Sequence, residues 1–153
     1  MPRIYEKNPG FRTKEIICRD LSIVLSNSEL SYAAKFAVVS EVTWVWSEFH
    51  GKHRGCPYWS KKALEGDRNP KKLIHEHAIP KKMLIGWLMN MKSPSPEDIN
   101  SLLSKYCIGV VVTKPEDQAL NAAGLRSEMP DDWNKKNPWA RYEAVGIVPV
   151  NVA

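Results

Sequence analysis

The sequence predicts an α+β fold: a single, mostly helical domain over residues 1–153, with a long central helix and a small sheet. Apolar residues recur at helical spacing through most of the chain, and several of these segments begin with a serine or threonine followed three residues later by an acid. Only short runs of β-branched residues interrupt them. With 43% hydrophobic residues, a chain of this length is large enough to form one hydrophobic core.

The expected elements follow one another with short connections. Helices are expected over 14–25 (a strand over 21–25 being the alternative), 29–49, 60–64, 81–91, 96–106 and 115–123, with a short last one from 138. Strands are expected over 73–79, 108–112 and 146–150. The first twelve residues are expected to be irregular. The helix over 29–49 is apolar on most sides, which predicts that the other elements pack around it.

Helix start signals support three of these assignments. Ser26 with Glu29, and Thr113 with Glu116, match the capping box, in which each side chain bonds the backbone of the other residue. Ser95 precedes a proline and two acids, which suit the first turn of a helix. These signals predict where the longest helix and the two helices after residue 95 begin.

Composition predicts a cytoplasmic protein. Cys18, Cys56 and Cys107 are odd in number and far apart, which argues against a disulfide framework and favours a reducing compartment. We expect Cys18 and Cys107 to be buried thiols. No apolar run approaches the roughly 18 residues of a membrane span, and the N-terminus carries no apolar signal core.

Positive charge is concentrated in the middle of the chain. Between His50 and Lys92, ten Lys or Arg stand against three acids, a local charge of +7 in a protein of net charge +5. Such a segment attracts polyanions, although it also fits an ordinary solvated surface. Because aromatic rings stack on bases while cations hold phosphates, we expect a nucleic-acid contact from Lys61, Lys62, Lys71, Lys72, Lys81, Lys82 and Trp59.

An acid between two histidines lies inside this basic segment. If residues 74–78 are extended, His75 and His77 point to one face and could chelate one metal, whereas Glu76 points to the other face. If the chain turns there, Glu76 and His77 could work as a pair. The sequence leaves both arrangements open.

The segment Glu76-His77-Ala78-Ile79-Pro80 resembles the first signature of the HNH, or ββα-metal, nucleases. The resemblance implies a metal-dependent nuclease in which His77 is the general base that activates water and Glu76 ligates a divalent metal, Mg²⁺ or Mn²⁺. It implies His75 as a further ligand or a water-orienting group. No histidine follows His77, so Asn90 and Asn100 are the near candidates for the family's remaining ligand. Other segments, such as Trp139-Ala140-Arg141-Tyr142, are similar to small bacterial and phage proteins, which implies no activity.

Two further hypotheses compete with the nuclease. Five residues within 28 positions carry the imidazole and thiolate groups that zinc prefers: His50, His53, Cys56, His75 and His77. They predict a structural Zn²⁺ site. The second hypothesis is a non-catalytic basic protein, or a phage or mobile-element inhibitor, that binds nucleic acid or an acidic protein partner. In that case the histidines of the motif are structural.

Overall fold

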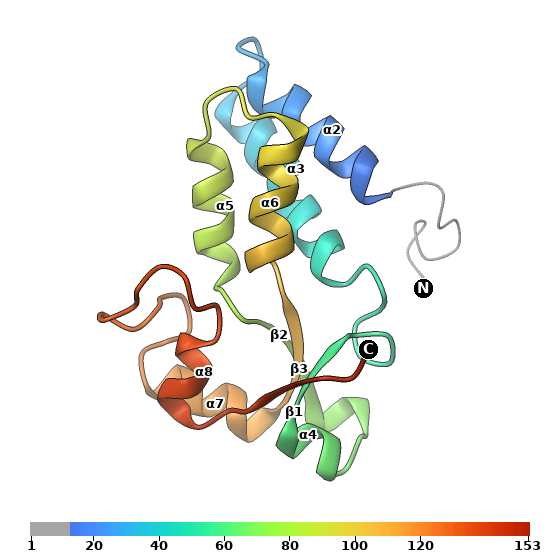
Figure 1. Ribbon diagram of the computed structural model, residues 1–153, viewed down its shortest axis with the longest axis vertical. Coiled ribbons are helices and arrows are strands. Elements are labelled where there is room, and N and C mark those ends of the chain that lie inside the picture. Colours follow the sequence, from blue (N-terminus) through green and yellow to red (C-terminus); the bar gives the residue numbers. More distant parts are fainter. Residues whose placement is uncertain (1–12) are drawn as a thin grey trace.

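The computed structural model describes residues 13–153 and confirms the α+β class (Figure 1). The expectation for residues 1–12 lies outside the described part. Four helices gather at one end of the molecule: α2 (Lys14–Ser26), α3 (Tyr32–Ser47), α5 (Lys81–Asn90) and α6 (Pro96–Tyr106). The small sheet lies at the other end with three shorter helices and a 3-10 turn: α4 (Lys61–Glu65), η1 (Pro70–Lys72), α7 (Lys114–Ala122) and α8 (Ala140–Val145).

The segment α2 is a helix, so the strand alternative over 21–25 is wrong. The hydroxyl of Thr13 accepts a hydrogen bond from the Ile16 amide at 3.2 Å and thereby caps the first turn. The side chains at helical spacing are buried against α3 and α6: Ile17, Cys18, Leu21 and Leu25. Burial of one face of the helix therefore decides the local structure, although Ile23 and Val24 are β-branched.

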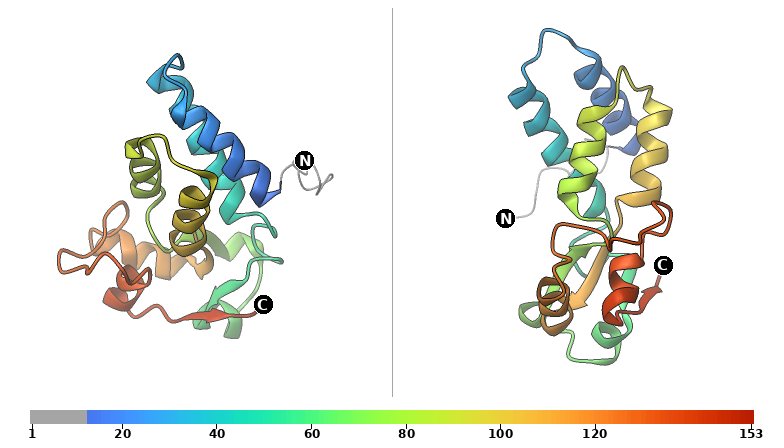
Figure 2. Two further views of the ribbon diagram at one scale, coloured as in Figure 1. Left: turned by 45° about the horizontal axis from the view of Figure 1, so that its top comes forward. Right: turned by 90° about the vertical axis from the view of Figure 1, so that its left-hand side faces the viewer.

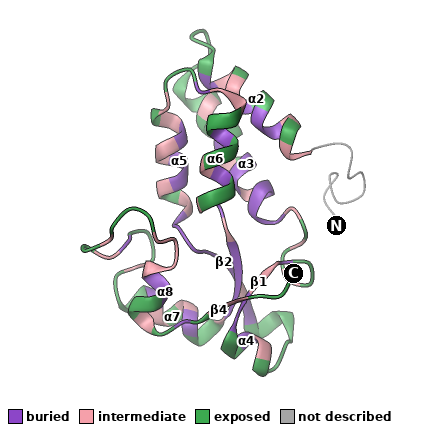
Figure 3. Ribbon diagram, in the orientation of Figure 1, coloured by how far each residue is buried: buried purple, intermediate pink, exposed green. Residues whose placement is uncertain are grey.

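The long helix α3 begins later than expected. Ser26 is the last residue of α2, and Ser31 caps α3 by accepting a hydrogen bond from the Ala34 amide at 3.1 Å. The expected box of Ser26 with Glu29 is replaced by a turn in which the Asn27 side chain accepts from the Glu29 amide. The C-terminal half of α3 is buried, but most of its first two turns is exposed (Figure 3). Only half of this helix is therefore central.

The sheet has four strands in the order β2-β3-β1-β4. The strands are β1 (Tyr58–Ser60), β2 (Leu73–His77), β3 (Gly109–Thr113) and β4 (Pro149–Asn151). The β1–β3 pair is parallel, whereas β1–β4 and β2–β3 are antiparallel. No strand was predicted for β1, since three residues are too few to show an alternating pattern. Among the strands of residues 13–153, β2 pairs only with β3, so it forms one edge of the sheet.

Each face of β3 packs against a different layer. Val110 and Val112 face α7 and α8, where they contact Leu120 and Tyr142. Val111 faces the opposite way, into a cluster of Cys56, Trp59, Ala63 and Leu73. The larger core lies between the four helices of the other end. The two side views show the sheet below this bundle, with α7 and α8 beside it (Figure 2).

A buried carboxylate joins the ends of the two parallel strands. Glu116 Oε2 accepts a hydrogen bond from the Ser60 hydroxyl at 2.7 Å and from the Thr113 amide at 2.9 Å. Ser60 and Thr113 are also the N-caps of α4 and α7, and the predicted box of Thr113 with Glu116 is confirmed. This network holds β1 beside β3. Since β1 occupies one side of β3, β2 pairs on the other side and forms an edge of the sheet.

Candidate functional site

The histidine motif forms the extended strand β2, so its three side chains alternate between the faces of the sheet. His75 and His77 point towards the C-terminal end of α3 and are each 7% exposed. Glu76 points to the opposite face, towards α8. Of the two arrangements that the sequence left open, the extended one is therefore correct. Glu76 and His77 do not form a pair on one side of the strand.

His77 is held by the last turn of α3. Its Nε2 lies 2.8 Å from the Ser47 hydroxyl oxygen. Ser47 donates its only hydroxyl proton to the Trp44 carbonyl at 3.0 Å, so His77 Nε2 must be the donor to Ser47. Burial, helped by the nearby His75 and Lys81, lowers the pKa of His77 to about 3. The imidazole is therefore neutral at physiological pH.

His75 is fixed by a loop carbonyl and a glycine. Its Nδ1 lies 2.7 Å from the Lys52 carbonyl oxygen, which can only accept, so Nδ1 carries the proton. Gly109 pairs with His77 on β3, and a Cβ there would come within 2.5 Å of the neighbouring His75 ring, so only glycine fits at this position. The rings of His75 and His77 lie 5.8 Å apart, edge to face. Both imidazoles are thus held in single orientations.

Glu76 is engaged by two residues of α8 that sequence reasoning did not assign to the site. Arg141 Nη2 donates to Glu76 Oε1 and the Tyr142 hydroxyl donates to Glu76 Oε2, each at 2.5 Å. Burial raises the pKa of Glu76, and the Arg141 guanidinium opposes that shift. Arg141, itself fully buried, also donates to the carbonyls of Ala78 and Leu125. The segment Trp139-Ala140-Arg141-Tyr142 was noted in the sequence only for its similarity to other proteins, and no partner was predicted for Arg141.

A polar cavity of about 480 Å³ extends around the free edge of β2. Its walls come from α3, β2, the start of α5, α7 and the segment before α8, and they include all three motif residues. The lining residues are Trp44, Ile74, His75, Glu76, His77, Pro80, Lys81, Asp117, Leu120, Asn121, Arg126 and Arg141. The Glu76–Arg141 pair carries no net charge. Among the other charged lining residues, the two cations Lys81 and Arg126 exceed the one anion, Asp117. The cavity therefore favours an anionic ligand.

The two predicted metal ligands do not point to one centre. The predicted ligands Glu76 and His75 lie on opposite faces of β2, and Glu76 is already bonded to Arg141 and Tyr142. Between residues 13 and 153, no three His, Cys, Asp or Glu side chains are grouped so as to hold an ion. In the predicted zinc set, the Cys56 thiol contacts the carbonyls of Tyr58 and Gly109, and burial raises its pKa.

The lysines predicted to contact nucleic acid lie in two groups, and the predicted Trp59 is buried. Lys61, Lys62, Lys71 and Lys72 lie on α4 and η1, before β2, whereas Lys81 and Lys82 begin α5 beyond its other end. Two of the first group have acidic neighbours: Lys61 lies 3.9 Å from Glu65 and Lys72 lies 2.8 Å from Asp67. Trp59 is only 8% exposed, and its indole N–H donates to the Cys56 carbonyl. Trp59 is thus a core residue, and its ring is not available to stack on bases.

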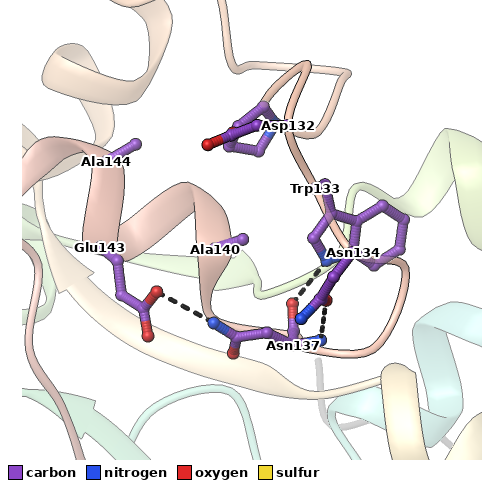
Figure 4. A pocket seen from close by; sticks show the side chains of 8 residues that line it. Asp132, Trp133, Asn134, Asn137, Ala140, Glu143 and Ala144 are labelled. Atoms are coloured by element: carbon purple, nitrogen blue, oxygen red, sulfur yellow. Dashed lines mark hydrogen bonds between the residues drawn. The ribbon is translucent and has the colours of Figure 1, made fainter.

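A second cavity, of about 380 Å³, lies between α8 and the segment before it (Figure 4). Asn137 connects its walls, since its side chain donates to Glu143 Oε2 at 2.9 Å and its carbonyl accepts from the Trp133 indole at 2.7 Å. Asn134 also accepts from the Asn137 amide. These hydrogen bonds stabilise the segment before α8 itself. None of the predicted site residues lines this second cavity. The cavity beside β2 is accordingly the candidate site.

Comparisons of the chain with protein-family models, curated proteins and solved structures find no match. The resemblance to the HNH signature therefore stays a prediction based on five residues. Across residues 13–153, no helix combines the length and the apolar character needed to cross a bilayer.

Proposed function

We propose that this protein binds nucleic acid and holds a backbone phosphate in the cavity beside β2. The observation that carries the proposal is the cavity's lining, to which Lys81 and Arg126 contribute two cations beside the motif residues. A phosphate offers acceptor oxygens and negative charge, which match the Lys81 ammonium and the Arg126 guanidinium of the lining. Trp44, from α3, adds an aromatic wall, with Lys81 Nζ 5.1 Å from its ring centre.

The protonation states favour binding over catalysis. A general base works best with a pKa near the operating pH, whereas His77 has a pKa of about 3 and shares its Nε2 proton with Ser47. Glu76 is held by Arg141 and Tyr142, so a role as a ligand or acid would require breaking a buried ion pair. The motif residues therefore support the cavity wall and its polarity in this proposal.

A second candidate is the HNH-like nuclease, and one observation favours it. His75, Glu76 and His77 all line the same cavity although they lie on opposite faces of β2, because the cavity extends around the strand edge. A bound phosphodiester could in that case meet both faces at once. No metal-dependent step follows from the arrangement as it stands.

The test is the affinity for labelled single-stranded DNA, duplex DNA and RNA over a series of salt concentrations. We expect the logarithm of the affinity to fall linearly with the logarithm of salt. Lys81→Glu and Arg126→Glu should each weaken binding by about tenfold or more and reduce the salt slope by about one. Lys105→Glu, on the exposed side of α6, makes the same charge change away from the cavity and should weaken binding less. No affinity at low salt, or equal losses in all three variants, would contradict the proposal.

A cleavage assay separates the two candidates. Each substrate is incubated with Mg²⁺, with Mn²⁺ and with a chelator, and the wild type is compared with His77→Asn. Binding without product in every condition supports the binding protein. Product that requires a divalent metal and disappears in His77→Asn, while that variant still binds, would replace it with the nuclease.

A further inference from the structure

Trp44 is the largest aromatic side chain of the cavity lining beside β2, and a phosphate alone gives its ring no role. The residue lies in the C-terminal half of α3, where its neighbours Val45 and Trp46 are buried but Trp44 itself is half-buried. The His77 ring lies 5.9 Å from the indole, tilted by 37°, and the His75 ring lies 6.3 Å away, edge-on. The two imidazoles of β2 therefore support the indole while it remains part of the cavity wall.

Two ammonium groups lie near this ring. Lys81 Nζ is 5.1 Å and Lys52 Nζ is 6.0 Å from its centre. An aromatic ring next to cations matches a nucleotide, in which a base is joined through one sugar to a phosphate. A phosphate held by Lys81 would therefore bring its base to Trp44. Lysine side chains are long and flexible, so the ammonium can leave the ring for the phosphate when a base stacks there.

The wall that α7 contributes carries polar groups that suit a base better than a phosphate. Asp117 and Asn121 lie one turn apart on α7, and both line the cavity. A carboxylate repels a phosphate, whereas it accepts a hydrogen bond from the amino group of a base. An asparagine side chain both donates and accepts, as the edges of bases do. These two residues therefore fit a base edge, while Lys81 and Arg126 fit the backbone.

We propose that the cavity accommodates one unpaired nucleotide, so that the ligand of this protein is single-stranded nucleic acid. The base stacks on Trp44, its edge meets Asp117 and Asn121, and its phosphate lies at Lys81. This inference rests on the proposed function, because it assigns the base of the nucleotide whose phosphate the cavity holds. Single strands of DNA and of RNA share this chemistry, and the experiment below distinguishes them.

A duplex does not suit this lining. Each base of a duplex is stacked between its neighbours and its Watson–Crick edge is paired, so a recessed site meets mainly phosphates and sugars. Trp44, Asp117 and Asn121 would then contact no unpaired base. The cavity measures about 480 Å³, within the range of about 300–1,000 Å³ for pockets that enclose small ligands. That size suits a single nucleotide.

Fluorescence anisotropy of the full chain with labelled oligonucleotides of about twelve nucleotides, at one low salt concentration, tests the inference. A DNA series and an RNA series each contain a single strand, the matching duplex and a strand of abasic sites, which keeps the phosphates and lacks the bases. In at least one series, the single strand should bind about fivefold or more tighter than the duplex and the abasic strand. The tighter of the two single strands identifies the sugar of the ligand.

Variants assign the base contact. Trp44→Ala should weaken binding of the single strand by about fivefold or more and leave binding of the abasic strand unchanged, whereas Trp44→Phe keeps a ring and should retain most of the affinity. Asn121→Ala, at an exposed position of α7, removes no packing and should show the same selective loss. Tyr32→Ala removes an exposed ring of the same helix outside the cavity lining and should match the wild type.

The outcomes separate this inference from the function on which it rests. Equal binding of normal and abasic strands in both series, or tighter binding of the duplex, would overturn the inference and leave phosphate binding intact. An equal loss for normal and abasic strands in both Trp44→Ala and Asn121→Ala would also overturn it, because neither residue would then meet a base. No binding to any oligonucleotide would contradict the proposed function itself.

Discussion

Arg141 Nη2 lies 2.5 Å from Glu76 Oε1, although the two residues are 65 positions apart in the chain. Arg141 is fully buried and the Glu76 side chain is 14% exposed. The pair joins α8 to the edge strand β2, and the other Arg141 hydrogen bonds reach the carbonyls of His77, Ala78, Leu125 and Arg126. One guanidinium thus connects the motif with the segment that closes one side of the cavity.

Removing the arginine should therefore destabilise the whole fold. Arg141→Met leaves Glu76 and several carbonyls buried without their donor, so we expect the free energy of unfolding to fall by about 3–5 kcal/mol. Urea denaturation followed by circular dichroism measures the change. Arg19→Met, which removes an exposed arginine paired with Asp20, should cost less than about 1 kcal/mol. A similar small loss in Arg141→Met would show that the buried pair contributes little.

His77 should make stability depend on pH. Its pKa falls from 6.5 to about 3 on folding, so the unfolded state binds a proton that the folded state does not. The contribution is complete above about pH 6.5 and is lost as the pH falls towards 3. When the pH falls from 7 to 4, protonation of His77 in the unfolded state should reduce the free energy of unfolding by roughly 3 kcal/mol. His77→Asn should lose correspondingly less stability over that range, and an unchanged pH dependence in this variant would contradict the assignment.

Gly109 should not tolerate a side chain. A methyl group there would lie 2.5 Å from the His75 ring and 2.8 Å from the Ser47 carbonyl oxygen. Gly109→Ala should consequently cost about 1–3 kcal/mol of unfolding free energy and shift the His75 ring resonances. Gly86→Ala is the matched control, because no atom lies within 4 Å of its added Cβ within α5. That variant should gain about 0.5–1 kcal/mol, since alanine favours the helix. Equal effects of the two substitutions would contradict the close contact at His75.

Chelation should leave the fold intact. Because His75 and Glu76 lie on opposite faces of β2 and the Cys56 thiol is bonded to the carbonyls of Tyr58 and Gly109, treatment with EDTA should shift the melting temperature by less than about 1 °C. Elemental analysis of the purified chain checks the same point. One equivalent of zinc, with a lower melting temperature after chelation, would instead support the site from His50, His53 and Cys56.

The local signals in the sequence were most reliable where one short segment contains all the necessary groups. The caps at Ser95 and Thr113 lie where their spacing predicted, because each needs only backbone amides three residues away. The start of α3 was misplaced, because Ser26 belongs to the last turn of α2 and Ser31 is the cap. The strand β1 had no local signal, since its pairing with β3 and β4 forms only in the folded chain.

The sequence by itself determined the helical spacing, the caps and the alternation of the motif residues in an extended chain, because these depend on neighbours within a few positions. Only the tertiary structure decided which partners they meet. Ser47 and Arg141 come from distant segments, and their contacts bury His77 as a neutral base and hold Glu76 in an ion pair. Burial and charge at such contacts arise from packing between elements, which no local pattern of residues encodes.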